Sequence, residues 1–268
     1  MTLTYPPDLG KSHITKPFSP PIIEARIANH LTLKDHRDNL EGLVAARTRE
    51  LQLIKDATVQ SLAALAEARD RETGNHIRRT QHYVRALAEQ LARNPRYREQ
   101  LDEATIERLF KTAPLHDIGK VGVPDAILQK PGKLSSEEFE VMKHHPRLGR
   151  EAMREASEMM LASGCGDDFF HCAGEIAGTH HEKWDGSGYP DGLSGGQIPL
   201  PGRLMAVADV YDALISTRAY KSAMDWDQVR DHIVGGRGSH FDPDCVDAFL
   251  DAEEEFRAIA ERYRDGGG

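Results

Sequence analysis

The chain has 268 residues, with 34 Lys+Arg against 43 Asp+Glu, so its formal net charge is −9. An acidic chain is poorly suited to bind DNA or an anionic membrane surface, and no run of residues approaches the ~18 apolar positions of a membrane span. The N-terminus lacks the apolar segment of a secretory signal, and the three cysteines have no C-x-x-C spacing. We therefore expect a cytoplasmic protein without a disulfide framework or a zinc ribbon.

A long helix is predicted after the first 21 residues, which five prolines interrupt. Residues 22–68 contain no proline and carry dense charges. One narrow apolar stripe follows the helical period there, at Leu40, Val44, Leu51, Ile54, Leu62 and Leu65. A parallel coiled-coil homodimer would cover this stripe, although Arg47 and Thr58 interrupt it. The alternative is a helix that lies on its own domain.

From Asp70 onward the sequence predicts a series of shorter helices separated by glycine and proline. We expect them at about 76–92, 103–117, 135–160, 168–182, 202–217 and 225–234. Ser135, followed by Glu137 and Glu138, is a typical helix start. No alternating apolar run predicts a sheet, so the fold class is all-α. The glycine- and proline-rich segment from Trp184 to Pro201 is a long loop, and such loops are usually functional.

Histidines and carboxylates recur in pairs that suit metal binding. Glu72 and His76 stand four residues apart and share a helix face, although such pairs are common on exposed helices. Adjacent His116 and Asp117 can serve neighbouring metals, since a carboxylate has two oxygens; the alternative is a core histidine beside a capping aspartate. A second adjacent pair is His180–His181. Asp209 lies in an apolar run and needs either a metal or an ion pair such as one with Arg203.

These motifs together resemble the HD-GYP domain, a subgroup of the HD phosphohydrolase superfamily that is associated with hydrolysis of cyclic di-GMP. The resemblance covers roughly residues 67–255 and implies an HD-domain helical bundle. The order, spacing and number of the matching segments make the resemblance specific. In chain order they are Glu72–His76, His116–Lys120, Val123–Asp125, Lys130–Lys133, Lys143–His145, His180–Pro190, Ala208–Leu214 and Phe241–Pro243.

The resemblance implies a set of metal ligands without sulfur. His145 is preferred to its neighbour His144 because of its spacing to Gly149. Imidazole and carboxylate ligands suit iron or manganese. The family carries two or three divalent ions, and its early Glu, here Glu72, is associated with the third. The implied ligands are Glu72, His76, His116, Asp117, His145, His180, His181 and Asp209.

The implied reaction is hydrolysis of a phosphodiester, giving pGpG, GMP or both. Paired metals activate a water molecule for in-line attack on phosphorus. The catalytic groups would be His116, Asp117, expected to bridge the metals, and Lys120, whose ammonium can reach a phosphate oxygen. Further substrate contacts are expected from Arg218, Lys221, Asp185 and Tyr189. In this family the loop that holds Tyr189 is also linked to binding of GGDEF (diguanylate cyclase) domains.

The chain is predicted to divide at residues 21, 68 and 257. Residues 1–21 resemble the C-terminal end of a receiver domain, in which Ile14–Phe18 would form the last strand and loop. The phosphoacceptor part of a receiver is missing, so no phosphorylation switch is expected. Residues 22–68 form the linker helix, 69–257 the HD-GYP domain, and 258–268 the tail, whose last residues should be disordered.

Two other functions remain open. The enzyme could hydrolyse another cyclic dinucleotide, such as a mixed cyclic GMP-AMP, because base recognition depends on the shape of the pocket. The chain could instead be a non-catalytic signalling module that binds a nucleotide or a cyclase partner. Retention of all eight ligand positions argues against a pure scaffold, because a scaffold has no physical need for a multi-metal site.

Overall fold

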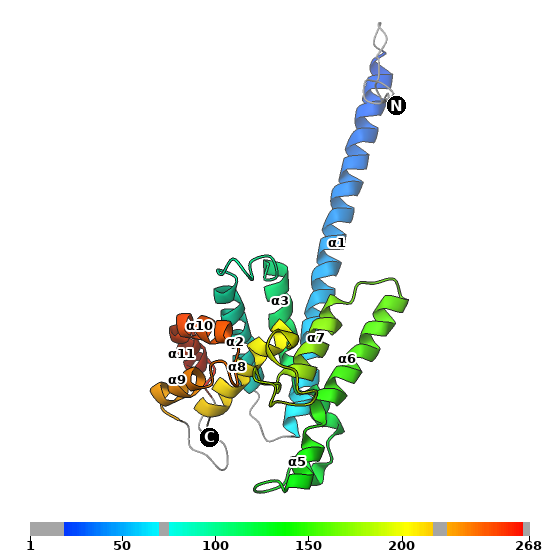
Figure 1. The fold of residues 1–268 in the computed structure, drawn as a ribbon. Coiled ribbons are helices and arrows are strands. Elements are labelled where there is room, and N and C mark those ends of the chain that lie inside the picture. Colours follow the sequence, from blue (N-terminus) through cyan, green and yellow to red (C-terminus); the bar gives the residue numbers. More distant parts are fainter. Residues whose placement is uncertain (1–18, 70–74, 217–223, 265–268) are drawn as a thin grey trace, which may run out of the picture. The chain divides into compact units, whose positions relative to one another are not determined.

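The computed structural model describes residues 19–69, 75–216 and 224–264, and this part of the chain is helical without any strand (Figure 1). The predicted all-α class is therefore confirmed. None of the described helices combines the length and the apolar character needed to cross a membrane. The helices are α1 (Pro20–Ala68), α2 (Asn75–Leu91), α3 (Glu103–Thr112), α4 (Asp125–Leu128), α5 (Ser136–Met142), α6 (His145–Ala162), α7 (Asp168–Thr179), α8 (Leu200–Ile215), α9 (Trp226–Gly235), α10 (Pro243–Asp251) and α11 (Glu253–Arg262), with short 3-10 helices at Ala113–Leu115, Ile118–Gly122 and Gly195–Gln197.

Most predicted helices are present, with one division, and three short helices were not predicted. The segment predicted as one helix over 135–160 is two, because Pro146 begins a new first turn, where its missing N–H costs nothing. Ser135 caps α5 as expected, in a reciprocal capping box with Glu138. The periodicity did not predict α4, α10 and α11, which have only four, nine and ten residues. The predicted domain end at residue 257 falls inside α11, where Ile259 and Ala260 are buried.

The chain divides into two units, residues 1–55 and a compact unit from Asp56 to Gly268. In the first unit, apolar side chains of α1 such as Leu40 and Leu51 are exposed by 61% and 66%. In the compact unit, α1 instead buries Val59, Ala63 and Ala66. The apolar stripe is exposed in this single chain, and the coiled-coil dimer that would cover it stays a prediction. The last turns of α1 belong to the same compact unit as α2.

The core of the compact unit is built around α2, which packs against α3, α8, α10 and α11. Tyr83 of α2 is fully buried and stacks on Phe256 of α11, with ring centroids 4.5 Å apart. Each large apolar side chain buried in this way contributes about 1.5–3 kcal/mol. A smaller cluster joins Val59 of α1 to Leu115 and to Ala173 of α7. The short turn that holds His116 and Asp117 therefore directly follows a residue of this buried cluster, Leu115.

A close approach of backbones sets the position of that turn against α6. Gly119 lies in the 3-10 helix Ile118–Gly122, which packs on α6. A Cβ atom at Gly119 would overlap the carbonyl oxygen of His145 and the amide nitrogen of Gly149. Only glycine fits this contact, which brings Asp117 beside the N-terminal turn of α6.

Candidate metal centre

Four side chains from three segments form the first cluster. Asp117 lies in the turn after Leu115, His145 begins α6, and His180 and His181 follow the last turn of α7. Each offers one ligand atom, and all four atoms lie within 4.8 Å of one another. The Nε2 atoms of His145 and His180 lie 3.2 Å and 3.7 Å from Oδ1 of Asp117. This convergence of imidazoles on a carboxylate is suited to a divalent cation.

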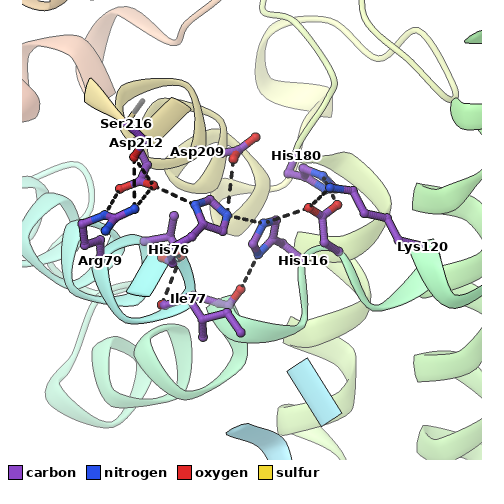
Figure 2. Close-up of polar contacts among 12 residues, drawn as sticks. His76, Ile77, Arg79, His116, Lys120, His180, Asp209, Asp212 and Ser216 are labelled. Carbon is purple, nitrogen blue, oxygen red and sulfur yellow. Dashed lines mark hydrogen bonds and ion pairs between the residues drawn. The ribbon is translucent and has the colours of Figure 1, made fainter. Parts of the chain in front are cut away.

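A second cluster adjoins the first and consists of His76, His116 and Asp209, whose ligand atoms also lie within 4.8 Å of one another. The Nε2 atom of His76 lies 3.3 Å from Nε2 of His116 and 3.8 Å from Oδ1 of Asp209 (Figure 2). His76 comes from α2 and Asp209 from α8. The packing of α2 on α8 therefore assembles this second candidate site.

The Asp117 carboxylate lies between the two clusters. Its Oδ1 faces His145, while its Oδ2 lies 3.3 Å from Nε2 of His116 and 2.7 Å from Nζ of Lys120. Burial opposes ionisation of Asp117, but Lys120 and His116 together hold the pKa of its carboxyl well below the usual range. Asp117 is therefore a carboxylate with one oxygen toward each cluster.

Two histidines of the first cluster, His180 and His181, are held in the form that binds metals. Burial lowers the pKa of His180, and burial together with the neighbouring His180 and His145 lowers the pKa of His181 well below its usual value. Both imidazoles are thus neutral near pH 7, with a lone pair available for a cation.

Three buried atoms of the first cluster test whether a metal fits. Oδ1 of Asp117, Nε2 of His145 and Nε2 of His180 have no hydrogen-bond partner among the described residues. Buried polar atoms are normally satisfied, and a convergent group without partners calls for an explanation. A divalent cation among them would satisfy all three. The donor set of nitrogen and oxygen, with no cysteine, also fits such an ion.

A cavity of about 170 Å³ opens over both clusters. Asp117 and His181 of the first cluster line it, as do Asp209 of the second cluster and Lys120. Its volume is below the roughly 300–1,000 Å³ of a site that encloses a drug-sized ligand. The cavity can hold one phosphate group and the atoms bonded to it, while the rest of a larger substrate would extend outside the cavity.

The family model described as "HD domain" matches residues 54–245 of this chain. The chain belongs to the HD domain family. This match covers the segment that supplies every described member of both clusters, and it agrees with the resemblance drawn from the motifs.

Curated relatives of this HD domain include two from Vibrio cholerae that are named "Probable cyclic di-GMP phosphodiesterase" and "Cyclic di-GMP phosphodiesterase". They are 50% and 56% identical, over 94% and 85% of this chain and 58% and 45% of their own lengths. A third, "3'3'-cGAMP-specific phosphodiesterase 2" from the same organism, is 41% identical over 83% of this chain and 38% of its own length. The chain thus spans about half the length of the curated relatives it matches.

The HD domain brings together seven of the eight predicted ligands, and the eighth, Glu72, lies outside the described residues, as do Arg218 and Lys221. His145 joins the cluster while His144 is exposed. The alternative ion pair for Asp209 is absent from the described residues, because Arg203 pairs with Asp242 at 2.8 Å.

The two predicted substrate contacts in the loop after α7 differ in position. The Tyr189 ring lies on His181, with centroids 4.8 Å apart, so it supports a member of the first cluster. Asp185 is exposed and its carboxylate accepts a hydrogen bond from the amide of Ser187, which forms a local turn. Neither residue lines the cavity.

Three buried charged residues near the site received no role from the sequence. Asp212 and Arg79 form an ion pair behind His76, and Glu182 lies beneath the loop after α7. Asp212 stands three residues after Asp209 in an apolar helix, and that spacing on one helix face was the available signal. Glu182 directly follows His181, but nothing local to it indicates which backbone amides it binds.

Proposed function

We propose that this chain is a metal-dependent phosphodiesterase that hydrolyses cyclic di-GMP to pGpG, GMP or both. The observation that carries the proposal is the Asp117 carboxylate, which has one oxygen toward each of two clusters beneath a shared cavity. Two adjacent divalent ions, when bound, lower the pKa of a coordinated water toward about 7 and neutralise charge on the phosphate. His116 and Asp117 would be ligands at the reacting centre.

Lys120 would bind the substrate's phosphate. Its ammonium is 2.7 Å from Asp117 and lines the cavity. A cation fixed there favours a non-bridging phosphate oxygen and stabilises the charge that develops as the bond to the leaving 3′-oxygen breaks. We assign Arg218 and Lys221 to further contacts with the substrate, and Asp185 and Tyr189 to the loop that borders the centre.

Iron or manganese is the proposed metal, because the ligands are imidazole and carboxylate without sulfur. The proposed ligands are the seven members of the two clusters, with Glu72 as the ligand of a third ion. Mn²⁺ or Fe²⁺ reconstitution followed by elemental analysis tests this assignment.

Cyclic di-GMP is preferred as substrate because the two relatives named as cyclic di-GMP phosphodiesterases are 50% and 56% identical to this chain. The relative named as 3'3'-cGAMP-specific is 41% identical. A mixed cyclic GMP-AMP is the second candidate, on the strength of that third relative. We further propose a cytoplasmic homodimer formed through α1 and a GGDEF-domain partner bound through the Tyr189 loop.

The test is turnover by the metal-loaded protein with cyclic di-GMP and 3'3'-cGAMP in parallel. Asp117→Ala should abolish hydrolysis and spare dimerisation, while Asp231→Ala, an exposed position on α9, should leave turnover unchanged. Hydrolysis of 3'3'-cGAMP alone would replace the preferred substrate by the second candidate. Full turnover by the Asp117→Ala protein would refute the metal mechanism, and metal binding without any turnover would favour the non-catalytic signalling module.

A further inference from the structure

Four of the five histidines of the two clusters are oriented by two different kinds of partner. His116, His145 and His180 each direct Nδ1 at a backbone carbonyl three or four residues earlier in the chain, at 2.9–3.1 Å. His76 instead directs Nδ1 at the carboxylate of Asp212, 2.8 Å away and 136 residues later. Among these four rings, only the one from α2 is backed by a charge.

The Asp212 carboxylate fixes which nitrogen of His76 faces the cluster. A carboxylate accepts a hydrogen bond and cannot donate one, so the ring proton is on Nδ1. The lone pair of Nε2 then points toward His116 and Asp209, as Figure 2 shows. A carboxylate behind a ligating histidine also raises the basicity of the ligating nitrogen, an effect that a neutral backbone carbonyl supplies less strongly.

Arg79 holds the Asp212 carboxylate in place. Its Nε donates to Oδ1 at 2.6 Å and its Nη2 to Oδ2 at 2.9 Å, which is a bidentate pair. Nη2 also donates to the Ser216 hydroxyl at 3.0 Å, and Nη1 to the backbone carbonyl of Tyr263 at 2.9 Å. The side chains of Arg79 and Asp212 are exposed by only 3% and 1%, so both are fixed by their surroundings.

The same two helices supply the ligands and their support. His76 and Arg79 are one turn apart on α2, and Asp209 and Asp212 are one turn apart on α8. The ion pair therefore sets the relative positions of the two helical ligands as well as the ring orientation of one of them. In the first cluster, His145 and His180 instead direct Nδ1 at backbone carbonyls.

We infer that Asp212, clamped by Arg79, is a positioning residue that strengthens metal binding at the His76–His116–Asp209 cluster and leaves the Asp117–His145–His180–His181 cluster unaffected. The inference rests on the proposed function only in that both clusters bind divalent cations. Breaking the ion pair would also loosen α2 on α8, so the protonated ring nitrogen of His76 is measured beside the metal affinity to separate orientation of the ring from packing of the helices.

Competitive titration with a chelator, on protein reconstituted with Mn²⁺, tests the inference through affinity and not through turnover. Asp212→Asn keeps the side-chain shape, removes the charge and lets an amide nitrogen face Nδ1. We expect one equivalent of Mn²⁺ to bind about 10–100-fold more weakly, with the remaining affinity unchanged. His76→Ala shows which equivalent belongs to this cluster.

Asp242→Asn is the matched control. It breaks another buried ion pair, that between Arg203 of α8 and Asp242 at 2.8 Å, which touches neither cluster. Its Mn²⁺ affinities should equal those of the wild type. Equal losses in the Asp212 and Asp242 variants, or wild-type affinity in the Asp212 variant, would overturn the inference. Failure of the wild type to bind any metal would instead refute the proposed function.

A measurement on the wild type covers the case in which Asp212→Asn does not fold. Long-range ¹H–¹⁵N correlation spectra of Zn²⁺-loaded protein report which ring nitrogen of each histidine is protonated, and the spectrum of His76→Gln assigns the signal. We expect a proton on Nδ1 of His76 and the metal on Nε2. A proton on Nε2 would overturn the inference without any change to Asp212.

Discussion

Replacing Glu182 by glutamine should loosen the loop that follows α7. The Glu182 carboxylate is buried, with 1% of the residue exposed. It accepts hydrogen bonds from the backbone amides of Asp191 at 2.7 Å and Leu193 at 3.1 Å. Glutamine retains one acceptor oxygen, but its amide group would face the second backbone N–H donor. One charge-assisted hydrogen bond is lost, the other is weakened, and a buried donor is left unsatisfied.

The magnitude follows from these two contacts. A hydrogen bond to a charged group contributes about 1.5–3 kcal/mol, and an unsatisfied buried donor costs about 1–3 kcal/mol. Since the loop can relax partly toward solvent, we expect the Glu182→Gln protein to lose about 2–3 kcal/mol of unfolding free energy. The amides of Asp191 and Leu193 should also exchange their hydrogens faster, because local opening no longer breaks two strong bonds.

Urea unfolding measures the loss, and hydrogen exchange locates it. Glu175→Gln is the control, since this carboxylate of α7 faces the exposed His171 at 3.6 Å and is not bonded to the loop. Its unfolding free energy should change by less than about 0.5 kcal/mol, as is usual for substitutions away from such networks. A similarly small change in the Glu182 variant, with unchanged exchange at both amides, would refute the reasoning.

Three further predictions concern the centre and its surroundings. Gly119→Ala should push the turn away from α6 and abolish metal binding by the first cluster, while Gly196→Ala, where a Cβ meets open space, should not; elemental analysis compares them. Lys120→Met should lower kcat by about 10²–10³-fold with metal content retained, and retained turnover would contradict its role at the phosphate. Burial, followed by nearby positive charge, lowers the pKa of His240 from 6.5 to about 4. The unfolded state therefore binds more protons than the folded state between these two pH values, and the free energy of unfolding falls as the pH drops from 6.5 toward 4. His240→Gln should flatten that decline in urea unfolding measured from pH 7 to 4, and an unchanged slope would count against it.

Local patterns in the sequence predicted most of the helices. The period of apolar residues predicted α2 and α7, which depend on residues within a few helical turns. The members of the two clusters, such as His116, Asp117 and His180, were implied by the resemblance to the HD-GYP domain, through motifs spread along the chain. Helix ends were less predictable: α8 begins two residues before its predicted start, at Leu200.

Long-range support of the centre could not be predicted from such patterns. The partner of His76 is 136 residues away, and the guanidinium of Arg69 pairs with the carbonyl of Val123 and with Asp125, which are 54 and 56 residues away. Contacts of this kind depend on how helices pack in three dimensions. The spacing of Asp212 from Asp209 places both on one helix face, but it does not show that His76 is the partner of Asp212. The contact of Arg69 with Val123 and Asp125 depends on the end of α1 lying against the segment that follows the His116–Asp117 turn.

The last turns of α1, from Asp56 onward, belong to the compact unit, and this decides where a fragment for expression should begin. A fragment beginning at α2 would contain every described member of both clusters, yet it would lack Val59, which covers Leu115 and Ala173, and Asp56, which pairs with Lys111 at 3.0 Å. The apolar surface thus uncovered would favour aggregation. A soluble fragment that holds both clusters should therefore start no later than Asp56, well ahead of His76.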